Sequence, residues 1–273
     1  MRKVKTVIVY IVLILTALIS IMPLVWMWQR AFVPKTLAGS DPFAIPKGFT
    51  FDNIINAWSI GKMKVYFKNS VLVSIPRVAG VLALATLAGY AFGKLKFKFR
   101  DAIFAFFLVG MMIPIQGEII PLYYTLQKWG LINSRLALIL PYFGIDMPFA
   151  IFMMRAFYRD LPSELMEQAK VDGCNEFTTF LYVMGPLVKP ALSALLVFEF
   201  MWSWNDMFLP MTVIYKDTSR TLPLGLMYFF GKYTSDQSLI AAGVTICTVP
   251  IIIIYVIFQK SFISGLTAGA VKG

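Results

Sequence analysis

Six long apolar segments divide this chain and limit what it can fold into. A helix needs roughly twenty apolar residues to cross the hydrocarbon core of a bilayer, since each residue adds about 1.5 Å. The segments that reach this length are residues 7–28, 70–93, 102–125, 136–155, 187–214 and 239–259. The sequence therefore predicts an all-α, polytopic membrane protein with six transmembrane helices.

The positive charge of the chain, +11 at pH 7, raises the question of a nucleic-acid partner. The lysines and arginines lie between the apolar segments and form no stripe with interleaved aromatic residues. This pattern favours membrane lipid and excludes nucleic acid as a partner. The sequence also has no histidine and no Walker A loop. We therefore expect no enzyme activity, no metal site and no cofactor bound by this chain.

Short basic segments set the expected orientation. The N-terminal residues Arg2, Lys3 and Lys5 and the segment 94–100 are strongly basic, and such segments stay in the cytoplasm. Alternation then places both termini and the polar loop 160–186 on the same side. The first apolar segment is longer than that of a signal peptide and lacks a small-residue cleavage site, so we expect it to be retained. The predicted location is the cell membrane, plasma or inner, with several spans.

Two regions follow from this topology. Residues 1–69 would hold the first helix and an extracytoplasmic loop, and residues 70–273 a core of five helices with the loop 160–186 and a cytoplasmic tail. Apolar residues recur at helical spacing in the outer loop, namely Phe51, Ile54, Ile55 and Trp58. They predict a short helix, which either contacts an extracytoplasmic partner or lies in the membrane interface.

Small residues recur every four positions in the second apolar segment, at Ala85, Gly89 and Gly93. Such a stripe lets the backbone of another helix approach closely. We therefore expect a tight helix–helix contact along this face.

Ionisable residues inside apolar segments are costly, about 2.5–3.5 kcal/mol each at the bilayer centre, so they need partners. Arg77 and Glu118 each lie about sixteen residues, roughly 24 Å, from the inner end of their segments. We predict that Arg77 pairs with Glu118, or with Asp146 if the rotation of the helices prefers it. The pair either holds the helices together or contacts a substrate.

The fifth apolar segment carries Glu199, Trp202 and Asp206 on one helical face, with Asn205 beside them. Carboxylates, amides and flat indole rings suit the hydroxyl groups and apolar faces of sugars. These residues predict a substrate pathway, although tryptophans near a membrane boundary also serve as interface anchors.

The loop 160–186 contains Glu167-Gln168-Ala169, then Gly173, then Val183-Met184-Gly185-Pro186. It resembles the EAA loop of ATP-binding-cassette importer permeases, in which Glu-Ala-Ala is followed by a glycine and by Ile-x-Leu-Pro. Gln168, Val183 and Gly185 depart from that pattern. Further motifs resemble those of the smaller permease subunit in the carbohydrate-importer branch, the maltose-transporter type. They are NSVLVSIP, LAGYAFG, MIPIQGEIIPLY, GLINSRLALILPY, SWNDMFLP and the tail SFISGLTAGAVKG.

This resemblance implies a type I importer permease fold in which the loop forms a coupling helix. The implied partners are a second homologous permease, an ATPase dimer that binds ATP and Mg²⁺, an extracytoplasmic solute-binding protein and a sugar. Glu167 would pair with a basic residue of the ATPase, and the tail 268–273 would either reach toward the ATPase dimer or form a frayed end. The implied coupling residues are Glu164, Glu167, Gln168, Ala169, Asp172, Gly173 and Pro186.

The residues of the loop fit a rigid knob. Pro162 ends the incoming helix, Ser163 can cap the next one, and Gly173 permits a sharp turn. We expect charged residues on one side of the knob and an apolar side formed by Leu165, Ala169, Val171 and Phe177.

Two other functions compete with an importer permease. An ion-gradient-driven secondary transporter or channel would use ionisable residues as a relay, namely Arg77, Glu118, Asp146 and Glu199, but would give the loop no purpose. An intramembrane hydrolase would need a nucleophile with a base or a paired-carboxylate motif, and the sequence has neither. The leading hypothesis is therefore a permease subunit for a sugar.

Overall fold

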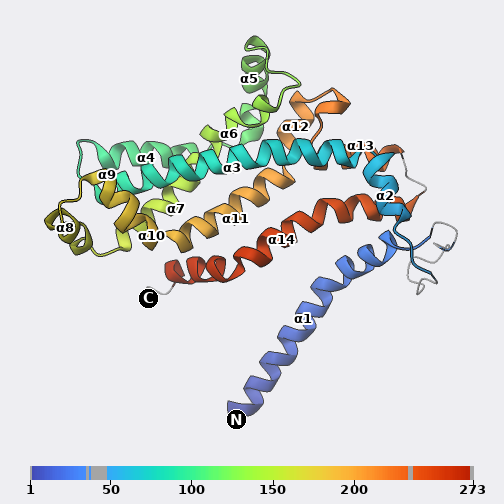
Figure 1. The fold of residues 1–273 in the computed structure, drawn as a ribbon, viewed down its shortest axis with the longest axis horizontal. Helices are drawn as coiled ribbons and strands as arrows, with labels where there is room; N and C mark the ends of the chain where they lie inside the picture. The colour runs from blue at the N-terminus through green and yellow to red at the C-terminus, as the bar shows by residue number, and fades with distance from the viewer. Residues whose placement is uncertain (1, 35–36, 38–47, 233–235, 271–273) are drawn as a thin grey trace. The chain divides into compact units, whose positions relative to one another are not determined.

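The computed structural model describes residues 2–34, 37, 48–232 and 236–270 (Figure 1). Within these ranges the chain forms helices and no strand, which confirms the all-α expectation. The elements up to the loop are α1 (Arg2–Ala31), α2 (Asp52–Ser59), α3 (Met63–Lys94), α4 (Arg100–Gly110), α5 (Ile115–Lys128), the 3₁₀ helix η2 (Arg135–Leu138), α6 (Leu140–Ile145) and α7 (Met147–Asp160).

The loop itself is helical, and the C-terminal third of the chain follows it. Its elements are α8 (Glu164–Val171), α9 (Glu176–Thr178), the π-helical turn η3 (Thr179–Met184) and α10 (Gly185–Leu187). The remaining elements are α11 (Lys189–Asn205), α12 (Phe208–Val213), the 3₁₀ helix η4 (Asp217–Ser219), α13 (Leu222–Lys232) and α14 (Gln237–Ala270).

Three helices, α1, α3 and α14, are each long and apolar enough to cross a membrane. Three further candidates are pairs of helices that meet at a break, with bends of 92° between α4 and α5, 46° at the start of α7, and 76° at the start of α11. The structure thus has up to six spans if each bent pair counts as one. The segments 102–125 and 136–155 are each broken by a bend, and 187–214 is interrupted between α11 and α12, which the apolar pattern alone does not predict.

Backbone chemistry explains where two of these bends fall. Pro114 precedes α5 with an extended backbone (φ −73°, ψ 135°), and a proline disfavours helical conformation in the residue before it. Pro148 stands in the first turn of α7, where its missing N–H costs no hydrogen bond, so a new helix starts there. Asp206 is also extended (φ −64°, ψ 120°) and ends α11.

The chain divides into two compact units, which we describe separately. The first comprises Met1–Val65 with Gly225–Pro250. In it, the Asn53 side chain donates hydrogen bonds to the carbonyl oxygens of Ala31 and Val33, which ties α2 to the end of α1. The helix α2 confirms the short helix expected in the outer loop, and Ile55 and Trp58 are exposed on it.

The second unit comprises Tyr66–Leu224 with Ile251–Gly273 and holds the larger core. The expected close contact along the small-residue stripe is present between α3 and α7. A Cβ atom on Gly89 would lie 2.4 Å from the Cβ of Met154, and one on Gly93 would lie 2.8 Å from the Cβ of Tyr158. Ala85 is fully buried on the same face. These two helices therefore meet backbone to backbone, as the four-residue spacing indicates.

Candidate functional site

The loop between α7 and α11 forms a compact projection. Gly173 has φ +82°, a conformation that residues with a Cβ rarely adopt, so it makes the sharp turn after α8 as expected. Across this turn Lys170 and Glu176 form an ion pair of 2.9 Å. Asn175 caps the next helix by accepting a hydrogen bond of 2.8 Å from the backbone N–H of Thr178.

Side chains from α3 hold the projection in place. The hydroxyl group of Tyr90, on α3, donates a hydrogen bond of 3.2 Å to Oε2 of Glu176. Lys94, at the end of α3, donates to the carbonyl oxygen of Leu161, just after α7. Both hydrogen bonds thus link the projection to α3.

The faces of α8 differ in part from the expectation. Ser163 occupies the N-cap position but its side chain makes no capping hydrogen bond. Ala169 is buried together with Met166, whereas Val171 is 88% exposed and Phe177 is also exposed. The predicted apolar side is therefore split, because Val171 lies about 200° around α8 from Ala169 and Phe177 lies beyond the turn at Gly173.

The remaining implied coupling residues lie on the surface of the projection. Those exposed are Glu164, Glu167, Gln168, Asp172 and Pro186. Ala268, Gly269 and Ala270 of the expected tail end α14, and residues 271–273 lie outside the described residues.

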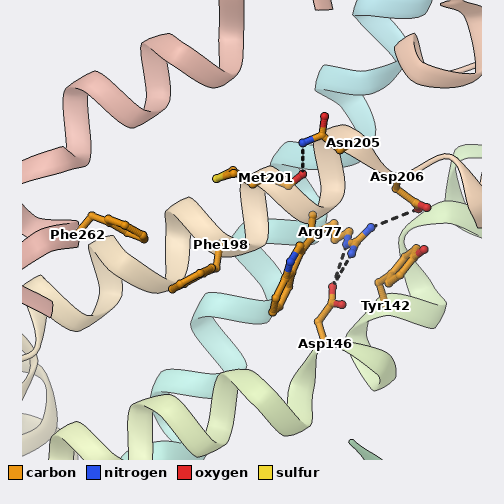
Figure 2. Close-up of a pocket in the computed structure, with 9 residues that line it drawn as sticks. Arg77, Tyr142, Asp146, Phe198, Met201, Asn205, Asp206 and Phe262 are labelled. Atoms are coloured by element: carbon orange, nitrogen blue, oxygen red, sulfur yellow. Dashed lines mark hydrogen bonds and ion pairs between the residues drawn. The ribbon is translucent and has the colours of Figure 1, made fainter. Parts of the chain in front are cut away.

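A buried ion cluster joins α3 to the junction of α6 and α7 and to the end of α11 (Figure 2). The Nε and Nη2 atoms of Arg77, on α3, each lie 2.9 Å from Oδ2 of Asp146, at the junction of α6 and α7. Nη1 of the same side chain lies 3.5 Å from Oδ2 of Asp206, at the end of α11. The guanidinium carbon sits 3.3 Å from the centre of the Tyr142 ring, and Arg77 is only 2% exposed.

The structure thus gives Arg77 the alternative partner, Asp146, and not Glu118. The prediction that Arg77 pairs with Glu118 assumed that both residues lie at the same depth on straight helices. The 92° bend between α4 and α5 moves Glu118 away from the axis of α4, so this assumption fails. Glu118 is half-buried and makes no ion pair within the described part of the chain.

The residues expected on one face of the fifth apolar segment do not share one environment. Glu199 is fully buried. Trp202 is 43% exposed, and the Asn205 side chain donates a hydrogen bond to the carbonyl oxygen of Met201. Asp206 lies beyond the helix end, so it turns toward Arg77 and not along the face that carries Glu199.

Two cavities adjoin this cluster. The first, about 560 Å³, is lined by polar side chains, Arg77, Tyr142, Asp146, Asn205 and Asp206, and by apolar ones, Phe198, Met201, Trp202 and Phe262 (Figure 2). The second, about 570 Å³, shares Asp146 and Trp202 with the first and adds Glu118. Both volumes are in the range of small-ligand sites. Three of the four residues expected in the substrate pathway, Trp202, Asn205 and Asp206, therefore line the first cavity, and Glu199 does not.

Sequence reasoning missed several residues of the first cavity. Phe198 lies four residues before Trp202 on α11, and their ring centres are 6.0 Å apart, so helical spacing could have found it. Tyr142 and Phe262 carry no such signal, because they reach the cavity from elements distant in sequence. No group of three or more potential metal ligands occurs among the residues that the structure describes.

Comparison with known proteins places the chain among transport proteins. The family described as "Binding-protein-dependent transport system inner membrane component" matches residues 85–267. The arabinooligosaccharides transport system permease protein AraQ of Halalkalibacterium halodurans is 35% identical, over 94% of this chain and 93% of its own length. The diacetylchitobiose uptake system permease protein NgcG of Streptomyces coelicolor is 30% identical, over 95% of this chain and 87% of its own length.

A solved structure shares the fold. A chain of a bacterial ABC transporter involved in the import of the acidic polysaccharide alginate superimposes with a TM-score of 0.80, at 19% identity, over 95% of this chain and 97% of its own. At this level of identity the match concerns the fold alone.

Proposed function

Because this chain belongs to the family of binding-protein-dependent transport inner membrane components, we propose that it is a permease subunit of an ATP-binding-cassette importer for oligosaccharides. The single observation that carries the proposal is the family match over 85–267, since it spans the projection, both carboxylates of the ion cluster and every lining residue of the two cavities except Arg77. The names of the relatives AraQ and NgcG support an oligosaccharide as the substrate.

The proposed assembly contains four kinds of partner. A second homologous permease completes the pathway, a dimer of ATPases binds ATP and Mg²⁺, a solute-binding protein delivers the sugar from outside, and lipid surrounds the spans. This chain supplies no catalytic group and binds no cofactor itself. Both termini and the loop 160–186 face the cytoplasm, in keeping with the basic segment 94–100.

The projection is the proposed contact with the ATPase. Its apolar residues Val171 and Phe177 are exposed beside the charged residues Glu167 and Asp172, a mixture that suits a protein partner. The ion pair of Lys170 with Glu176 and the bond from Tyr90 make the projection rigid, so movement of the ATPase would be passed to α3.

Crosslinking tests this contact. A single cysteine at Val171, in a chain whose Cys174 and Cys247 are replaced by serine, is expected to form an adduct with the ATPase in membranes that hold the complete transporter. Val171 is 88% exposed, whereas Ala169 is buried and unsuited to the reagent. The control is a cysteine at Tyr215, which is also exposed but follows α12, on the predicted outer side.

Two results would contradict the proposal. One is the absence of any ATPase adduct at Val171 in an assembled transporter, and the other is equal labelling at Tyr215. Uptake into vesicles driven by a proton or sodium gradient without ATP would instead favour a secondary transporter.

The cavities beside Trp202 are the proposed substrate pathway. Replacing Trp202 by alanine is expected to lower ATP-dependent sugar uptake about five- to tenfold, because the ring offers a flat face for an apolar side of a sugar. Trp129→Ala is the matched control, since Trp129 is exposed at the end of α5 and lines neither cavity. Transport unchanged by Trp202→Ala in a normally assembled complex would remove this residue from the pathway.

A further inference from the structure

We propose that the two cavities sharing Trp202 select uncharged sugars and reject sugars that carry a carboxylate. This inference rests on the proposed function and adds to it the class of substrate. It follows from the charges that line the cavities and from the way in which their cation is already bound.

Carboxylates outnumber cations around the cavities. Asp146 and Asp206 line the first cavity, and Asp146 and Glu118 line the second. Arg77 is the only cation among the described residues that line either cavity. With these carboxyl groups ionised, the walls carry more negative than positive charge.

The positive charge of Arg77 is committed to the protein. Its guanidinium group lies between Asp146, at 2.9 Å, and Asp206, at 3.5 Å, and the ring of Tyr142 covers it at 3.3 Å. Figure 2 shows the side chain directed at these groups. Since Arg77 is only 2% exposed, a carboxylate on a ligand would find no free guanidinium to bind.

The groups left for a ligand include carboxylate acceptors, the amide group of Asn205 and flat rings. The carboxylate of Asp206 is 12% exposed, and that of Glu118 makes no ion pair in the described chain. Both can accept hydrogen bonds from sugar hydroxyl groups. Trp202 and Phe198 supply the aromatic surface beside them.

An anionic sugar would meet these same carboxylates. Like charges repel, and the one cation among the described lining residues, Arg77, is already paired with Asp146 and Asp206. The cavities therefore discriminate by charge, in addition to any selection by the solute-binding protein.

Direct binding to the complete transporter, without the solute-binding protein, tests the inference. The probes are four neutral disaccharides, arabinobiose, galactobiose, cellobiose and N,N′-diacetylchitobiose, and for each a counterpart with its terminal CH₂OH oxidised to a carboxylate. We expect at least one neutral disaccharide to bind, and its counterpart to bind about tenfold or more weakly in equilibrium dialysis.

Two substitutions locate the source of the discrimination. Glu118→Gln removes a carboxylate that makes no ion pair among the described residues, so the variant is expected to fold normally. In the double variant Glu118→Gln/Asp206→Asn, the ratio between the affinity for the neutral disaccharide and that for its carboxylate counterpart should fall about tenfold. Asp52→Asn is the matched control, because Asp52 is exposed on α2 and lines neither cavity, and the preference should stay as in the wild type.

The outcomes separate this inference from the proposed function. A counterpart that binds the wild type as tightly as its neutral parent, or a preference unchanged in the double variant, overturns the charge selection. If no disaccharide binds although ATP-dependent sugar uptake persists with the solute-binding protein, the cavities are not the sugar site. Failure of all ATP-dependent sugar uptake would contradict the proposed function itself.

Discussion

Replacing Arg77 by alanine is expected to destabilise the protein by about 3–5 kcal/mol or to prevent its assembly. The substitution leaves Asp146 and Asp206 buried without their counter-ion, and it removes the cation from the ring of Tyr142. Arg77→Lys keeps the charge but loses the planar fork that reaches both carboxylates, so we expect an intermediate loss. Thermal unfolding of the purified transporter in detergent measures both effects.

Arg159→Ala is the matched control for this prediction. Arg159 is exposed, and its nearest carboxylate, that of Asp160, lies 4.0 Å away. Surface ion pairs of this kind contribute about 0–1 kcal/mol, so the unfolding temperature should hardly change. A triple variant, Arg77→Met with Asp146→Asn and Asp206→Asn, should recover part of the stability because it contains no unpaired charge. Equal behaviour of Arg77→Ala and Arg159→Ala would show that the cluster does not stabilise the fold.

Replacing Gly89 by leucine is expected to separate α3 from α7 and to lower stability by about 1–3 kcal/mol or more. A Cβ atom at this position would lie 2.4 Å from the Cβ of Met154 and 3.0 Å from the backbone nitrogen of Arg155. Because the second obstacle is backbone, no change of side-chain rotamer relieves the overlap. Gly89→Ala should already destabilise, and leucine more so.

Gly144→Ala gives the control for the helix contact. No atom lies within 4 Å of a Cβ placed on Gly144, which is in α6. Alanine favours a helix over glycine by about 1 kcal/mol, so this variant should unfold at the same temperature as the wild type or slightly higher. If Gly89→Leu matched it in thermal unfolding, the close approach of α3 and α7 would not hold in the protein.

The sequence predicts the apolar helices well because length and hydrophobicity suffice to identify them. It does not predict where they break. Pro23, Pro76 and Pro250 lie inside continuous helices, whereas Pro114 and Pro148 stand at bends. Proline is thus found both inside helices and at bends. The outcome depends on whether neighbouring helices satisfy the backbone carbonyl group that loses its hydrogen bond to the proline.

The candidate site was also predicted only in part, because the bends between helices could not be predicted from the sequence. Arg77 could be recognised as a buried charge from its place in an apolar segment, and Asp146 was one of its two expected partners. The choice against Glu118 depends on the bend before α5, which no periodicity encodes. In the loop, Gly173 could be placed at a turn, but the hydrogen bond of Tyr90 to Glu176 joins elements distant in sequence and carries no signal in the periodicity.

The position of Arg77 has a mechanical consequence. The projection joins one end of α7 to one end of α11, and Arg77 joins their opposite ends through Asp146 and Asp206. At 1.5 Å per residue the two helices are about 21 and 25 Å long. Because they are connected at both ends, a movement at one end of the pair is transmitted to the other. Coupling between two binding sites is reciprocal. A sugar that moves the ends of α7 and α11 near Arg77 should therefore change the affinity of the projection for the proposed ATPase by the same factor as ATPase binding changes the affinity for the sugar.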